Sequence, residues 1–69
     1  MKYHVTEATS RVYGFSFPAR DFDEKWQALS YAKGVAYKIA EWAPGTGGSL
    51  FPVVRDDRGY ETPYSILLY

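Results

Sequence analysis

The sequence predicts an α+β domain of ββαββ order, in which a single long helix packs on one face of one mainly antiparallel four-stranded sheet. Three observations lead to this fold. Alternating apolar and polar residues fill two stretches near the N-terminus, apolar residues recur at helical spacing in the middle, and two more extended stretches follow. A helix between two hairpins packs naturally on one sheet face. With 69 residues the chain has room for a single domain, 1–69.

The first hairpin is predicted from two alternating stretches. Lys2–Glu7 places Tyr3 and Val5 on one side, and Arg11–Phe17 places aromatic residues on one side. The small polar pair Thr9–Ser10 between them suits a tight connection. The predicted core residues of the second strand are Tyr13, Phe15 and Phe17.

The helix is predicted to run from Phe22 to Trp42. Asp21 has the character of an N-cap residue, and Glu24 follows at the spacing of a capping box. Trp26 lies within the apolar stripe and is the predicted central anchor of the core. The stripe comprises Phe22, Trp26, Leu29, Ala32, Ala36 and Ile39, flanked by Ala28, Val35 and Trp42.

Gly34 falls on the polar side of this helix, where glycine lowers stability by about 1 kcal/mol relative to alanine. It is either a tolerated defect or a notch where the backbone of a partner approaches. Pro44–Gly45 ends the helix. The glycine-rich loop Gly45–Ser49 then leaves a helix and enters a strand, so it lacks the helix N-terminus that phosphate-binding loops use.

The second hairpin pairs Leu50–Arg55 with the start of Tyr60–Tyr69. The turn is Asp56–Gly59, with Gly59 placed for a left-handed residue. In this register Arg55 faces Glu61, an opposite-charge pair that supports the pairing. The apolar segment Ser65–Tyr69 is expected to pair with another strand, the first of the chain.

One helix covers one face of a sheet, so the other face should stay uncovered. By alternation that face carries polar residues together with an apolar group that is unusual for a solvent-facing surface. This assignment depends on the hairpin register, because a slip of one residue exchanges the two faces. The predicted interaction surface comprises Phe51, Val53, Leu67, Tyr69, Val12 and His4.

No residue pattern indicates catalysis, a metal or a cofactor. The chain has no cysteine and one histidine, His4, without a placed carboxylate or nucleophile beside it. The acidic residues serve the predicted helix start and the last turn. We therefore expect a protein that is not an enzyme and that binds no cofactor.

Charge argues against a nucleic-acid partner, because eight Lys and Arg residues balance eight Asp and Glu residues. A nucleic-acid-binding module remains the alternative, with Arg11 and the rings of the aromatic strand stacking on bases. No segment reaches the roughly 18 apolar residues of a membrane span. The N-terminus lacks the features of a signal peptide, and the cytoplasm is the default location.

Certain motifs give the chain a resemblance to small bacterial and phage ββαββ domains. They are Lys2-Tyr3-His4-Val5, the alanines spaced by four along the helix, Asp57-Arg58-Gly59, and Pro63-Tyr64-Ser65-Ile66. In size and style the chain is also similar to phage-encoded inhibitors of bacterial defence systems, such as anti-CRISPR proteins. This resemblance implies no site residues.

The sequence therefore predicts a non-enzymatic protein-binding module rich in aromatic residues, which make up 19% of the chain. A phage-type inhibitor that occludes a surface of a host defence protein is one form of this prediction. The partner is a host protein or a second copy, with a homodimer slightly favoured. Besides the nucleic-acid alternative, a structural homo-oligomer subunit is considered, as is a monomer in which Leu67 and Tyr69 fold under Gly45–Ser49.

Overall fold

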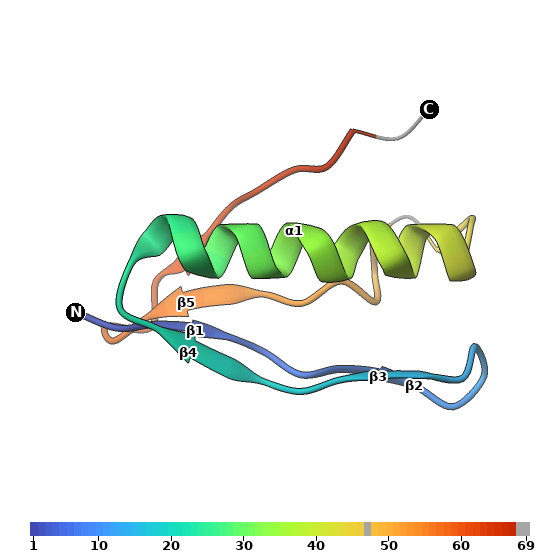
Figure 1. Ribbon diagram of the computed structural model, residues 1–69, viewed down its shortest axis with the longest axis horizontal. Coiled ribbons are helices and arrows are strands. Elements are labelled where there is room, and N and C mark those ends of the chain that lie inside the picture. Colours follow the sequence, from blue (N-terminus) through green and yellow to red (C-terminus); the bar gives the residue numbers. More distant parts are fainter. Residues whose placement is uncertain (47, 68–69) are drawn as a thin grey trace.

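The computed structural model describes residues 1–46 and 48–67, and it has the predicted α+β composition with one helix and antiparallel strands (Figure 1). The single-sheet prediction holds only in part. A four-stranded sheet has the order β4-β1-β5-β6, and a separate two-stranded sheet pairs β2 with β3. The elements are β1 (Tyr3–Val5), β2 (Ala8–Ser10), β3 (Phe15–Phe17), β4 (Arg20–Phe22), α1 (Lys25–Trp42), β5 (Val54–Asp56) and β6 (Glu61–Thr62).

The two sheets share one long hairpin that is interrupted in the middle. The register that pairs Thr9 with Ser16 in the outer half also pairs His4 with Asp21 in the inner half. Pro18 lies at the interruption and has no N–H to donate to the ladder. The tip of the hairpin is the turn before Phe15, where Gly14 has a φ of 74°. The predicted connection at Thr9–Ser10 is therefore wrong, because both residues belong to β2.

The interruption shifts the alternation of buried and exposed side chains by one residue. Val5 and Ala8 are both buried although they are three positions apart, whereas a continuous strand would bury residues of the same parity. In this part of the hairpin, the residues that face the helix thus change from odd-numbered to even-numbered positions at Thr6–Glu7. In the opposite strand Phe15 is buried and Phe17 half-buried, as predicted, while Tyr13 lies in the turn and is exposed.

The helix begins at Lys25, later than predicted, and ends at Trp42 as predicted. Asp21 is not its N-cap, because β4 continues the hairpin through Phe22 and the Asp21 carboxylate is bonded to His4. Glu24 takes the N-cap position without a side-chain capping hydrogen bond. At the other end the Ala43 N–H donates to the Ile39 carbonyl at 2.7 Å.

Small side chains form the centre of the interface between α1 and the strands. Ala28 and Ala32 are fully buried with Val5 and Val54 in one cluster, so the helix lies close to the four-stranded sheet. A second cluster lies over β2 and β3, and its members are Ala8, Phe15, Val35, Ile39 and Ala43. The prediction that Trp26 anchors the core is wrong, because its side chain is 65% exposed.

The last hairpin has the predicted register, with Arg55 opposite Glu61. Gly59 has a φ of 84°, and its N–H donates to the Asp56 carbonyl. The buried Asp56 carboxylate accepts N–H bonds from Arg58 and Tyr60. Burial alone would raise the pKa of Asp56, but these donors and the Arg58 charge outweigh it, and the pKa is lowered.

Strand β6 ends at Thr62, one residue before Pro63. The expectation that Ser65 and its successors pair with the first strand is wrong for residues 65–67, because β4 and β5 occupy both edges of β1. The segment instead passes along α1, where the Leu67 N–H donates to the Tyr37 hydroxyl at 2.9 Å (Figure 1). Leu68 and Tyr69 lie outside the described residues. Over residues 1–46 and 48–67, no helix has the length and apolar character needed to cross a membrane.

Candidate interaction site

The six residues of the predicted interaction surface do not share one face. Phe51 and Val53 line a groove of about 400 Å³ together with Pro52, Glu61, Tyr64, Ser65 and Ile66. Leu67 follows this segment and is 70% exposed. Val12 belongs to the turn that joins β2 to β3, and His4 belongs to β1. This turn and β1 lie far apart (Figure 1), and Tyr69 is outside the described residues. We call the groove that Phe51 and Val53 line the C-terminal groove.

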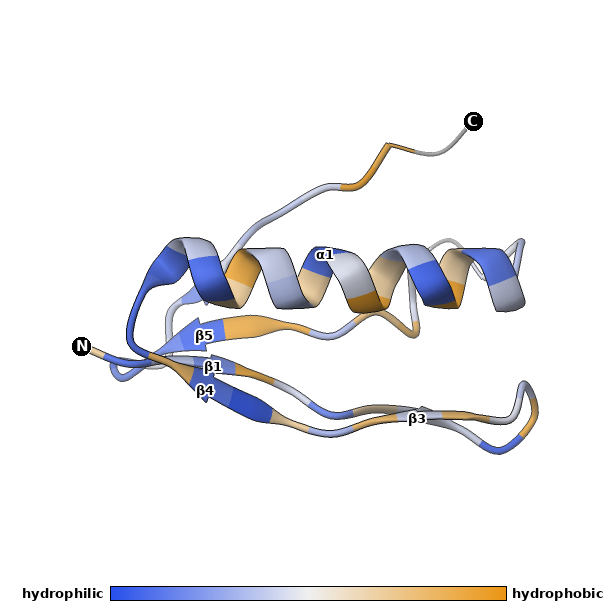
Figure 2. Cartoon of the chain, in the orientation of Figure 1, coloured by the Kyte–Doolittle hydropathy of each residue, from blue (hydrophilic) through white to orange (hydrophobic). Residues whose placement is uncertain are grey.

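The uncovered face of the four-stranded sheet is polar, contrary to the expected apolar patch. Each strand contributes one side chain to a row across it: Asp21, His4, Arg55 and Glu61 are neighbours in register. Figure 2 shows the same hydrophilic character along β4 and at the end of β5. The expected apolar residues lie outside the strands of this sheet: Phe51 and Val53 precede β5, which begins at Val54, and Leu67 follows β6, which ends at Thr62.

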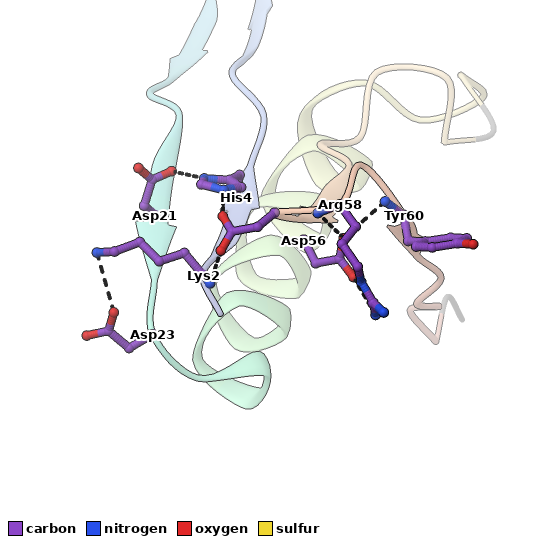
Figure 3. A network of polar contacts seen from close by, with 8 residues as sticks. Lys2, His4, Asp21, Asp23, Asp56, Arg58 and Tyr60 are labelled. Atoms are coloured by element: carbon purple, nitrogen blue, oxygen red, sulfur yellow. Dashed lines mark hydrogen bonds and ion pairs between the residues drawn. The ribbon is translucent and has the colours of Figure 1, made fainter.

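His4 joins three segments of this polar face. Its Nδ1 lies 2.7 Å from an Asp21 oxygen, and its Nε2 lies 2.9 Å from an Asp57 oxygen (Figure 3). The hydrogen bond to Asp21 and then that to Asp57 raise the pKa of His4 above 6.5, against a smaller opposing effect of burial. The N–H of Lys2, followed by the bond to His4, lowers the pKa of Asp57. We call the cluster of Lys2, His4, Asp21 and Asp57 the His4 clasp.

The clasp makes stability depend on pH in a defined direction. Because the folded-state pKa of His4 is raised, its contribution is complete below about pH 6.5 and is lost as the pH rises through the folded value. We expect the melting temperature to fall over this interval in the wild type and to change less in His4→Gln. Thermal scans from pH 6 to 8 test this; equal slopes for the two proteins would show that the clasp contributes nothing.

The clasp is not arranged as a metal site. The two carboxylates bond opposite nitrogens of the ring, so the acidic oxygens do not converge on one point beside a single ring nitrogen. Within the part of the chain that the structure describes, no group of three or more His, Asp or Glu side chains could hold a metal ion. The geometry supports a link between β1, β4 and the β5–β6 turn.

A second groove lies between α1 and the outer half of the hairpin. It measures about 390 Å³, and its lining consists of Phe17, Ser30, Tyr31, Gly34, Val35 and Lys38. Gly34 lies within it without a side chain, and a Cβ at that position would meet nothing within 4 Å. We call this hollow the helix–hairpin groove.

Aromatic rings extend the helix–hairpin groove at one end. Trp42 stacks on Phe17 with centroids 6.0 Å apart, and the Trp42 side chain remains 51% exposed. The Tyr31 hydroxyl donates to the Pro18 carbonyl at 2.9 Å, which fixes the interrupted part of the hairpin against the helix. The groove is thus bounded by rings whose positions are set by packing and by one hydrogen bond.

Two cations lie along the same side of the molecule. The Arg20 guanidinium is 5.1 Å from the ring centroid of Tyr31, and Lys38 belongs to the lining itself. Among the described residues, the ion pairs involve Lys2, His4 and Arg58 but neither Arg20 nor Lys38. The helix–hairpin groove is therefore apolar inside, with a positive charge near each end.

Sequence reasoning did not find this groove. A notch for a partner was one of the two interpretations of Gly34. The groove also needs Phe17, however, and the position of Phe17 beside the helix is set by tertiary packing.

No family model matches the chain, and neither the curated proteins nor the solved structures include a significant match.

Proposed function

We propose that this chain is a non-enzymatic protein-binding module that holds its partner in the helix–hairpin groove. The observation that carries this proposal is the notch at Gly34 in a groove of about 390 Å³, flanked by Tyr31 and Phe17 and continued by the exposed ring of Trp42. Tryptophan and tyrosine are the side chains most enriched among residues that dominate binding energy in protein interfaces.

The composition of the groove favours a protein partner over nucleic acid. Among the described residues, Lys38 is the one charged member of its lining, and the chain as a whole has no net charge. Nucleic-acid binding draws much of its affinity from several phosphate contacts made by clustered cations. A phage-type inhibitor that covers a surface of a host defence protein is one form of the proposed function.

Site-specific photo-crosslinking tests the proposal. A photoreactive phenylalanine analogue is placed at Ser30, which lines the helix–hairpin groove, and separately at Ser65, which lines the C-terminal groove. The control position is Ser16, an exposed residue of β3 between the inward-facing Phe15 and Phe17. We expect nuclease-resistant protein adducts from Ser30 and none from Ser16.

The alternatives give different adducts. Adducts that disappear on nuclease treatment would indicate a nucleic-acid-binding module, and adducts only with a second copy would indicate a structural homo-oligomer. If Ser65 crosslinks to a partner and Ser30 does not, the C-terminal groove is the binding site and the proposed one is wrong.

Two substitutions at Gly34 separate binding from folding. Gly34→Ala should stabilise the free protein by about 1 kcal/mol, because alanine favours the helix and its Cβ meets no neighbour. Gly34→Gln should also remain folded, but its longer side chain fills the groove and should remove the Ser30 adducts. Chemical denaturation of both variants checks the folding; adducts that survive in Gly34→Gln would contradict the assignment.

A further inference from the structure

We infer that the helix–hairpin groove binds an extended peptide segment that carries a bulky apolar residue between two acidic residues. This inference rests on the proposed function and specifies the chemistry of the partner. Its three parts are the apolar interior of the groove, the cations near its two ends, and the strand edge beside it.

The interior suits one bulky apolar side chain. Phe17, Tyr31 and Val35 supply the walls, and Gly34 leaves space where any other residue would project. The volume of about 390 Å³ is near the lower end of the range for small-ligand pockets. It therefore fits a single side chain with the backbone that carries it better than a large ligand.

The two cations define the charge and the spacing of the flanking residues. Arg20 lies against Tyr31 of α1. Lys38 is seven positions after Tyr31 in the same helix, which corresponds to about 10 Å along its axis. An extended chain advances about 3.3 Å per residue, so it covers this distance in roughly three residues. Two carboxylates four positions apart, with the apolar residue midway between them, lie on the same side of an extended chain and would reach both cations.

The neighbouring strand favours an extended partner. β3 pairs with β2 in a sheet of two strands, so in the described part of the chain its other edge has no strand partner. Open strand edges accept extended peptides, whose alternate side chains then enter adjacent pockets. A segment beside Phe17 could thus use the β3 backbone while its apolar side chain enters the groove.

A displayed library of random heptapeptides, selected against the full chain, supplies the probes. We expect selected peptides to share an aromatic or large aliphatic residue flanked by Asp or Glu. Fluorescence polarisation with one labelled peptide then compares the wild type with Lys38→Glu and with Lys33→Glu, a matched change at an exposed helix position outside the lining. Lys38→Glu should weaken binding about fivefold or more, and Lys33→Glu much less.

A charge exchange completes the test. A peptide in which lysine replaces the acidic residue facing Lys38 should bind Lys38→Glu more tightly than it binds the wild type. If the selected peptides lack acidic residues and Gly34→Gln removes their binding, the inferred acidic flanks are wrong, whereas the proposed protein-binding function is unaffected. If the selection yields no binding peptide, or if Gly34→Gln leaves binding unchanged, the groove is not a peptide site. The crosslinked adducts at Ser30 test protein binding separately.

Discussion

Replacement of Ile39 by alanine should destabilise the protein by about 2–5 kcal/mol, the usual range for truncation of a buried isoleucine. Ile39 is fully buried and belongs to the cluster that joins α1 to β2 and β3. Native domains are stable by only about 5–15 kcal/mol, and small ones bury the least surface. The substitution can therefore unfold most of the population at 37 °C.

The matched control is Trp26→Ala. The Trp26 side chain is larger than that of Ile39, but it is 65% exposed, so its removal takes few atoms from the core. We expect a change in unfolding free energy within about 0.5 kcal/mol, as for surface substitutions in general. Urea unfolding followed by circular dichroism measures both variants. If Trp26→Ala were the more damaging of the two, the burial in this structure would be wrong.

Local patterns predicted the parts of the fold that local interactions determine. The register of the last hairpin followed from the Arg55–Glu61 pair and from a glycine at the position that needs positive φ. The end of α1 followed from Pro44–Gly45, since neither residue favours continuation of a helix. In each case the residues that carry the signal are neighbours in the chain or in one turn.

The first hairpin was placed incorrectly because its interruption mimics a boundary. The second strand of the hairpin was predicted to end at Phe17, but the chain continues beyond Pro18 in the same register as β4. Asp21 then had the appearance of a helix cap, although its actual partner is His4, 17 positions away. The alternation of buried and exposed side chains also shifts by one residue at the interruption. A prediction that assumes unbroken alternation along the strand cannot detect such a shift.

The predicted apolar stripe of α1 is confirmed at Ala32, Ala36 and Ile39 and at the flanking Ala28 and Val35, but its anchor was wrongly placed at Trp26. The centre of the helix interface consists of small residues, and Trp26 and Trp42 lie at its margins with exposed rings. The helix–hairpin groove follows from the same arrangement, because close packing at the alanines leaves Tyr31 and Phe17 to line the flank. Of its residues, Gly34 alone carried a signal in the sequence, as an unfavourable residue in a helix.

Replacement of Ala32 by leucine should destabilise the protein although leucine is a good helix former and more hydrophobic. Ala32 is fully buried against Val5, Ala28 and Val54. Three added carbon atoms have no space there unless α1 moves away from β1 and β5, which would separate the rest of the interface. Overpacking of this kind costs typically 1–3 kcal/mol and occasionally more.

The adjacent change Lys33→Leu is the control for the helix itself. Lys33 is exposed, and lysine and leucine have similar helix propensities, so the unfolding free energy should change by less than about 0.5 kcal/mol. In a domain of this size, each kcal/mol shifts the melting temperature by about 4–8 °C, so thermal scans resolve the difference. An Ala32→Leu protein as stable as Lys33→Leu would mean that the helix does not lie close to the sheet at Ala32. In that event the small residues would no longer account for where the large rings are placed.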